Sequence, residues 1–238
     1  MPDIMRGRIC RIPLPADEAS LHKKTPPPMH EITWRIFRIM AEFVEGFQFL
    51  SEFTREVTIF GSARYPETNR WYKEARKLGG MLAECGYTVI TGGGPGIMEA
   101  ANRGAHEFHG VSVGLNIQLP LEQRINPWVN RGRGFHYFFT RKVMLAASAQ
   151  AYVFFPGGFG TLDEMFEMIT LIQTGKSVKI PIVLVGHAFW DPLISWIDST
   201  LVDEETIDPE DRKIYRVVDH AEEAFDIIQR ESVERSFF

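Results

Sequence analysis

The chain has 238 residues, of which 45% are hydrophobic and 24% are charged, and its formal net charge at pH 7 is −5. These proportions are typical of a globular protein with a sizeable core, and the negative charge argues against a broad nucleic-acid surface. The two cysteines, Cys10 and Cys85, form no paired framework, and no signal peptide or membrane-spanning run is visible. We therefore expect a cytoplasmic protein that binds neither nucleic acid nor membrane.

The first 55 residues are predicted to be an extension. Pro13, Pro15 and the run 26–28 fall within residues 1–30, and proline has no N–H and a fixed φ, so this stretch is predicted to be a flexible, proline-rich arm. Apolar residues then recur every three or four positions, which predicts an amphipathic helix within 31–55. Its stripe consists of Ile32, Ile36, Ile39, Met40, Phe43, Phe47 and Leu50, and Trp34, Phe37 and Phe49 lie off it.

So wide an apolar surface needs a second covering surface beyond the helix's own domain. We therefore expect a homodimer or a larger homo-oligomer, with this helix at a subunit contact. The alternative is a helix that its own chain covers completely.

From residue 56 the predicted elements alternate between strand and helix. Strands are predicted at 57–60, 87–90, 111–115, 151–155 and 180–185, and helices at 70–85, 97–106, from about 141, 161–174, 190–201 and 220–231, with 116–134 as a loop. Continuously apolar strands are buried on both faces, and their alternation with helices indicates right-handed βαβ units. The predicted fold class is α/β: a Rossmann-like doubly wound parallel sheet over 56–238, with an N-terminal helical extension.

Three glycine-bearing turns directly follow predicted strands: Gly61-Ser62, Gly92–Gly96 and Gly157–Thr161. Ligands of parallel sheets bind at this edge, where glycines let backbone N–H groups approach an anion and a helix N-terminus adds partial positive charge. One such turn is explained by a tight connection alone, whereas three in one sheet favour a bound ligand.

Neither of the common phosphate-binding patterns is complete. Ile97 stands where a dinucleotide fingerprint that starts at Gly92 requires glycine, and Thr170 stands where a P-loop ending at Gly175-Lys176-Ser177 requires it. Gly175 is instead interpreted as the end of a helix. No metal-ligand pattern is evident either, so no metal is expected.

Charged residues stand at two predicted helix starts. Thr161 and Glu164 have the spacing of a capping box, which also brings Glu164 to the rim of the third glycine turn. Arg141 and Lys142 follow Thr140, where cations oppose the helix dipole, and a local rule broken in this way is often found at a functional site. The residues alone leave open a purely structural cap and a solvated pair.

These strings resemble the Lonely Guy family of nucleoside 5′-monophosphate phosphoribohydrolases, which is often labelled lysine decarboxylase-like. The resemblance lies in FGSAR at 60–64, GGGPGIMEAAN at 92–102, Arg141-Lys142 and PGGFGTLDE at 156–164, and it covers roughly residues 56–186. It implies hydrolysis of the N-glycosidic bond of a purine or cytokinin-type nucleoside 5′-monophosphate, without a cofactor, to a free base and ribose 5-phosphate.

The resemblance also implies that Arg141 and Glu164 form the catalytic pair. The glycine turns contribute Ser62, Gly93, Gly94, Gly96 and Gly157 as expected substrate-binding residues, and the resemblance adds Glu122, Lys142, Gly158, Gly160, Thr161 and Thr170.

Two alternatives stay open. One is a non-catalytic carrier of a nucleotide or of a molybdenum cofactor on the same fold, and the other is an interaction protein that works through residues 31–53 and the proline-rich arm before them. The presence of Arg141 together with Glu164 favours an enzyme, because pure binding of an anion does not need a carboxylate beside it.

Overall fold

The computed structural model describes residues 29–118 and 125–232. The chain divides into two units, residues 1–38 and residues 39–238. The proline-rich arm predicted for residues 1–30 therefore lies, up to residue 28, outside the described part. No helix in the described ranges is long and apolar enough to cross a membrane.

Helix α1 (Met29–Leu50) extends across the division between the two units. In the first unit it exposes large apolar side chains, among them Trp34, Ile36 and Phe37. In the second unit Gly46 and Leu50 are buried, and Phe43, Phe47 and Phe49 pack against the core. The helix expected from the apolar repeat is therefore present, and its second half belongs to the main body.

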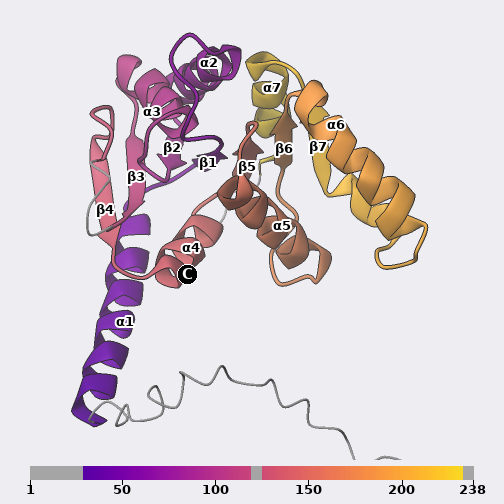
Figure 1. Ribbon diagram of the computed structural model, residues 1–238. Helices are drawn as coiled ribbons and strands as arrows, with labels where there is room; N and C mark the ends of the chain where they lie inside the picture. Colours follow the sequence, from indigo (N-terminus) through magenta and orange to yellow (C-terminus); the bar gives the residue numbers. More distant parts are fainter. Residues whose placement is uncertain (1–28, 119–124, 233–238) are drawn as a thin grey trace, which may run out of the picture. The chain divides into compact units, whose positions relative to one another are not determined.

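The second unit is built on a sheet of seven parallel strands in the order β4-β3-β2-β1-β5-β6-β7 (Figure 1). The strands are β1 (Glu56–Phe60), β2 (Thr88–Thr91), β3 (Ser112–Ile117), β4 (Arg131–Phe135), β5 (Ala151–Phe154), β6 (Ile182–Val185) and β7 (Tyr215–Val218). The α/β fold class and the parallel, doubly wound sheet predicted from the sequence are confirmed.

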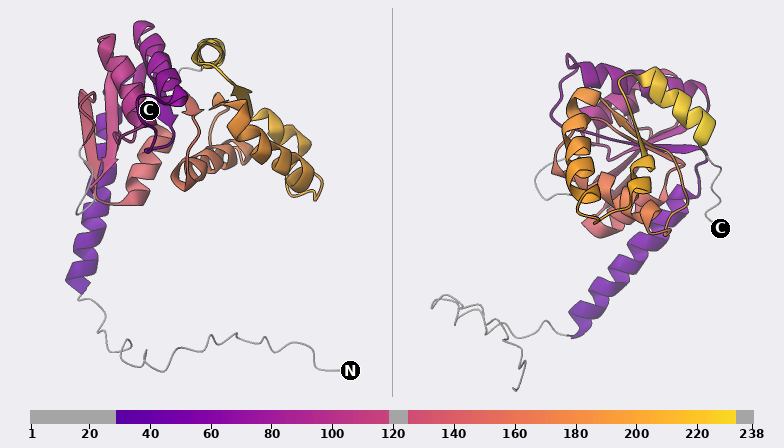
Figure 2. Two further views of the ribbon diagram at one scale, coloured as in Figure 1. Left: turned by 45° about the horizontal axis from the view of Figure 1, so that its top comes forward. Right: turned by 90° about the vertical axis from the view of Figure 1, so that its right-hand side faces the viewer.

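Helices cover both faces of this sheet (Figure 2). One apolar cluster joins the strands to α2 (Arg70–Glu84), α3 (Ile97–Glu107) and α7 (Ala221–Glu231). The other joins them to the end of α1 and to α4 (Phe138–Ala147), α5 (Phe159–Gln173) and α6 (His187–Trp196). In β1, Val57 and Ile59 belong to the first cluster and Phe60 to the second, so apolar side chains of this strand pack on both faces of the sheet.

The strand order places a topological switch between β1 and β5. The chain moves outward from β1 to β4, returns to pair β5 with β1, and then moves outward in the other direction. The helix after β1 lies on one face and the helix after β5 on the other, so the loops diverge at the carboxyl ends of these two strands. Such a crevice is where open α/β sheets bind ligands.

The two edge strands were not predicted. Residues 131–135 form β4, and all but the last of them fall in the stretch 116–134 that was expected to be a loop. The strand was missed because its sequence RGRGF is polar and rich in glycine and buries only Phe135. Residues 215–218 form β7, which buries only Tyr215 and Val218. Two short segments, a π-helix at Ile197–Val202 and a 3-10 helix at Pro209–Lys213, precede this strand.

Candidate active site

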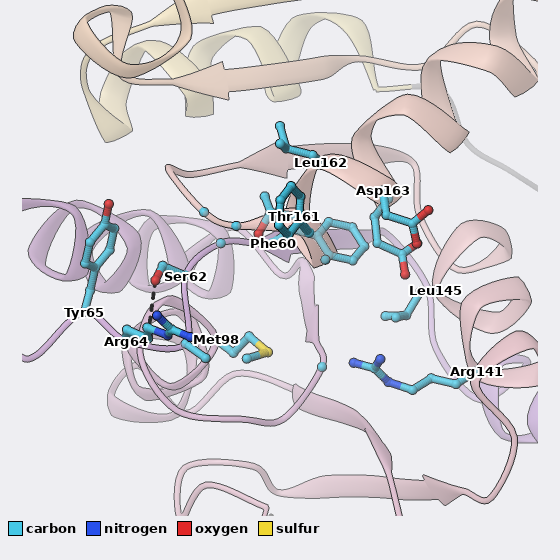
Figure 3. A pocket seen from close by; sticks show the side chains of 18 of the residues that line it. Phe60, Ser62, Arg64, Tyr65, Met98, Arg141, Leu145, Thr161, Leu162 and Asp163 are labelled. Atoms are coloured by element: carbon cyan, nitrogen blue, oxygen red, sulfur yellow. Dashed lines mark hydrogen bonds between the residues drawn. The ribbon is translucent and has the colours of Figure 1, made fainter. Parts of the chain in front are cut away.

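A cavity of about 760 Å³ opens at the carboxyl ends of β1 and β5. Its lining consists of Phe60–Tyr65 after β1, Gly92 and Met98 near α3, Phe138, Arg141 and Leu145 of α4, and Gly157–Glu164 at the start of α5. In Figure 3, Arg141 extends into the cavity from one side, whereas Ser62, Arg64 and Tyr65 lie on the opposite side. The structure thus brings together these expected site residues: Ser62, Arg141, Gly157, Gly158, Gly160, Thr161 and Glu164.

The start of α5 presents backbone donors to this cavity. Gly158 is the N-cap residue, and no side chain in the described part of the molecule caps the helix. The first N–H groups of a helix lack acceptors within it, and the helix dipole adds partial positive charge there. A Cβ atom on Gly157 would collide with the side chain of Thr161, whereas Gly158 and Gly160 face open space. This end of the cavity suits a phosphate.

The prediction of a capping box at Thr161 and Glu164 is wrong. The helix begins two residues earlier, so Thr161 is its third residue and Glu164 belongs to its second turn. A capping box would have filled the orphan N–H positions with protein oxygens. With the glycine start, the N–H of Thr161 donates to the carbonyl of Gly158 at 3.0 Å, and the N–H groups of Gly158–Gly160 face the cavity without an acceptor among the described residues.

Glu164 is a buried carboxyl group with 8% of its surface exposed. Its Oε2 atom accepts no hydrogen bond from the described residues. Burial raises the pKa of Glu164 to about 7; Lys142 and Arg141 act to lower this pKa, and Glu167 and Asp163 act to raise it. A carboxyl group with a pKa near neutrality can exchange protons under working conditions, and perturbed groups of this kind cluster at functional sites.

Arg141 is held in place by backbone groups. Its Nε donates to the carbonyl of Leu115 at 2.6 Å, and its guanidinium lies so close to Gly92 that a Cβ atom there would collide with it. Burial lowers the pKa of Arg141, and the charge of Glu164 opposes that shift. An arginine remains protonated nonetheless, so a fixed cation faces the cavity.

The helix that carries Arg141 also starts earlier than expected. Helix α4 begins at Phe138, so Arg141 and Lys142 are its fourth and fifth residues rather than its first. The effect of the helix dipole falls off within the first turn. The unfavourable interaction of these two cations with the dipole is therefore smaller than the sequence suggested.

Lys142 is paired with carboxylates instead of lining the cavity. Its Nζ lies 2.7 Å from Asp163 Oδ2 and 3.3 Å from Glu167 Oε2. This arrangement joins α4 to α5 beside Glu164, and it places a second cation near that carboxyl group.

Other expected binding residues lie behind the lining or outside the described ranges. The carbonyls of Gly93 and Gly94 accept hydrogen bonds from Asn126, and these bonds hold the second glycine turn in place. Gly96 (φ +70°) packs against the backbone of the first turn. Thr170 is exposed, with its hydroxyl donating to the carbonyl of Phe166 at 2.7 Å. Glu122 lies outside the described residues.

Several lining residues were missed by the sequence analysis. Arg64 and Tyr65 come shortly after the first glycine turn. Their position after a central strand could have identified them as candidates for the ligand site. Gly92 was passed over in favour of the other glycines in its run. Phe138 and Met98 enter from helices whose orientation no local pattern specifies.

Replacing Glu164 with glutamine should stabilise the protein at alkaline pH. The folded-state pKa lies above the unfolded value, so the stability associated with the bound proton is present below pH 4.5 and is lost as pH rises through about 7. Glutamine does not ionise and escapes that loss. We expect the free energy of unfolding of Glu164→Gln to exceed that of the parent by on the order of 3 kcal/mol at pH 8, with most of the gain gone at pH 5.

Urea denaturation at the two pH values measures this difference. The matched control is Glu231→Gln at the exposed end of α7, which should show no such gain because its side chain stays in water. A Glu164→Gln protein that is less stable than the parent at pH 8 would restore a structural role for this carboxylate.

Comparison with known proteins places these features in a family. The family model described as possible lysine decarboxylase matches residues 98–228, more than half of the chain. The cytokinin riboside 5′-monophosphate phosphoribohydrolase LOG of Oryza sativa subsp. japonica is 34% identical over 152 residues, which are 62% of this chain and 62% of that protein. The chain thus spans less than two thirds of the length of that relative.

Solved structures share the fold. The X-ray structure of TM1055 matches with a TM-score of 0.57 and 27% identity, covering 74% of this chain and 99% of that one. The molybdenum cofactor carrier protein of Chlamydomonas reinhardtii matches with a TM-score of 0.56 and 20% identity, covering 74% of this chain and 97% of that one, which shows a common fold alone. From the family match and the curated relative, this chain belongs to the Lonely Guy family, whose family model carries the lysine decarboxylase description.

Proposed function

We propose that this protein hydrolyses the N-glycosidic bond of a purine or cytokinin-type nucleoside 5′-monophosphate, releasing the base and ribose 5-phosphate. The observation that carries the proposal is the position of Glu164, a buried carboxyl group with a pKa of about 7, one turn into a helix whose N-terminus is open to an anion. The name of the rice relative, a phosphoribohydrolase of cytokinin riboside 5′-monophosphate, supports the same substrate class.

The phosphate would anchor the nucleotide at the start of α5. Backbone N–H groups of Gly158–Gly160, the hydroxyl of Thr161 and the helix dipole would hold it without a counter-ion from the protein. With the phosphate fixed there, the ribose falls beside the second turn of α5, which carries Glu164. The rest of the cavity, toward Met98 and Phe138, is left for the base.

Bond cleavage follows the chemistry of glycoside hydrolysis. The bond between C1′ and the base nitrogen breaks, the base leaves with the electron pair and takes up a proton from the solvent, and positive charge develops on the sugar. Water adds to C1′ as Glu164, in its ionised form, stabilises that charge and accepts a proton from the water. Glu164 then releases this proton to the solvent, so that one water is consumed in each turnover. Arg141 holds the nucleotide and favours departure of the base through its fixed charge.

The alternative function is a carrier that binds a ligand without turnover. It is considered because the molybdenum cofactor carrier protein has the same fold. The buried Glu164 favours an enzyme over a carrier. An ionised carboxyl group weakens the binding of a nearby anion, so a protein that only binds its ligand would gain nothing from this residue. Tight binding of AMP with no release of adenine would favour the carrier.

Purified protein should release adenine from AMP without added metal or cofactor and should leave adenosine intact, because adenosine lacks the phosphate that anchors the substrate. The value of kcat/KM should rise with pH through about 7 as Glu164 loses its proton. Chromatography of the released base over a panel of nucleoside monophosphates measures both the activity and the preferred base.

The variants Glu164→Gln and Arg141→Ala should each lower kcat by on the order of 10²-fold or more, the size expected for a lost electrostatic contact to the transition state. Glu231→Gln serves as the folded control. Cleavage of adenosine as fast as AMP would contradict the phosphate site, and a folded Glu164→Gln enzyme with normal turnover would remove Glu164 from the mechanism.

We also propose that the protein is a homodimer or a larger homo-oligomer, with the apolar surface of α1 at a subunit contact. Trp34, Ile36 and Phe37 expose between 51% and 70% of their surface. Phe49, by contrast, packs on Phe53 with ring centroids 5.0 Å apart, so it is covered by its own chain. Soluble proteins seldom leave rings of this size uncovered, and each such side chain gains roughly 1.5–3 kcal/mol when it is buried.

Light scattering coupled to size exclusion should give at least twice the 27.2 kDa mass of the chain at micromolar concentration. The double variant Ile36→Ser and Phe37→Ser should shift the mass toward the monomer, because it removes apolar surface from the contact. A monomeric parent with full activity would refute the assembly, and an unchanged mass in the double variant would place the contact elsewhere.

A further inference from the structure

Helix α4 carries Arg141 but has no cap of its own. Its N-cap residue is Tyr137, whose side chain caps nothing. The residues just before α4, His136 and Tyr137, follow directly on the edge strand β4, so little of the sheet holds them. An uncapped helix start frays, and Arg141 is only the fourth residue of this helix.

A carboxylate from a distant part of the chain occupies this helix start. Glu42 of α1 accepts hydrogen bonds from the backbone N–H of His136 at 2.7 Å, from the backbone N–H of Tyr137 at 3.3 Å and from the hydroxyl of Thr140 at 2.6 Å. A negative charge at this end of a helix also interacts favourably with its dipole. Glu42 therefore supplies the cap that the local sequence of α4 lacks.

The hydrogen bonds continue from Glu42 toward Arg141. The amide of Arg141 donates to the carbonyl of Tyr137 at 3.3 Å, in the first turn of α4, and the amide of that same Tyr137 is bound by Glu42. Thr140, which precedes Arg141, is fully buried, and its single hydroxyl proton is shared between Glu42 and the carbonyl of Tyr137, which lies 2.8 Å from the hydroxyl oxygen. Glu42 thus fixes the backbone from which the Arg141 side chain extends to Gly92 and the carbonyl of Leu115.

Neighbouring contacts keep this part of α1 against the same segment. Glu45 forms an ion pair with Arg133 of β4. Gly46 lies so close to Met144 of α4 that a Cβ atom would approach its sulfur to 2.7 Å. The second half of α1 therefore lies along both β4 and α4, and Glu42 is the residue that reaches the helix start.

We infer that Glu42 is a positioning residue for the active site: it caps α4 and thereby fixes Arg141 within the cavity. The contacts of Glu42 with the start of α4 do not depend on what the protein does, whereas the catalytic consequence rests on the proposed function. The N-terminal extension is, on this account, part of the apparatus that orients Arg141, in addition to any role in assembly.

The test compares Glu42→Ala and Glu42→Gln with a matched control, Glu52→Gln. Glu52 follows α1 and lies 3.6 Å from Arg131 of β4, so its variant loses a neighbouring contact without touching the start of α4. In the full-length protein, hydrogen exchange at residues 136–142 should become about tenfold faster in Glu42→Ala, as expected from losing a helix cap. Glu42→Gln should lie between this variant and the parent, and Glu52→Gln should match the parent.

Turnover of AMP distinguishes a loss of positioning from a loss of folded protein. We expect kcat to fall about tenfold in Glu42→Ala and the acid limb of its pH profile to move to higher pH. Glu164 faces two cations on α4, Arg141 and Lys142, and two carboxylates on α5, Asp163 and Glu167. Displacing α4 withdraws the cations and leaves the carboxylates, so the pKa of Glu164 rises. A smaller folded fraction would lower the rate without moving the limb.

Each outcome decides a separate point. Exchange and turnover equal to the parent in Glu42→Ala would overturn the inference, and faster exchange with unchanged kcat and an unchanged limb would reduce Glu42 to a structural cap. If Glu42→Ala does not fold, the milder Glu42→Gln gives the same comparison. If the parent releases no base from any nucleoside monophosphate, the proposed function fails, while the exchange data still show whether Glu42 holds α4.

Discussion

A carboxyl group buried with one oxygen unbonded is costly when it is ionised, and Glu164 in the lining of the cavity is such a group. Burial raises its pKa to about 7, and two cations on α4, Lys142 and Arg141, offset part of that cost. The relative placement of α4 and α5 therefore decides how far burial raises the pKa of Glu164. The chemistry that we propose depends on keeping that carboxyl group dry, close to a cation and near a site for an anion.

The surrounding structure holds α4 in this place from several directions. The carbonyl of Leu115 at the end of β3 accepts a hydrogen bond from Arg141, and Gly92 leaves room for its guanidinium. The second glycine turn is braced in turn by buried Asn102 and Asn126, which hydrogen-bond to each other and to neighbouring residues. Glu42 adds a contact from outside the sheet. Gly92 of this turn thus lines the cavity beside the guanidinium of Arg141.

The sequence predicts the central part of this fold well and the periphery poorly, for one physical reason. Strands buried on both faces, such as residues 57–60, are mostly apolar or β-branched, so they are visible in the sequence. Edge strands such as Arg131–Phe135 are half exposed and lack that signal. The candidate site behaves in the same way. Glycine turns and the residues around Glu164 are local patterns, whereas the contact of Glu42 with Tyr137 joins residues 95 positions apart and has no local signature.

The central claim concerns where a nucleotide lies relative to Glu164, and the crystal structure of the Glu164→Gln variant with AMP tests it most directly. The account predicts phosphate oxygens within hydrogen-bonding distance of the backbone N–H groups of Gly158–Gly160, with C1′ of the ribose beside residue 164 and Arg141 in contact with the nucleotide. A phosphate bound instead beside Arg64, on the opposite side of the cavity, with C1′ away from residue 164, would contradict it.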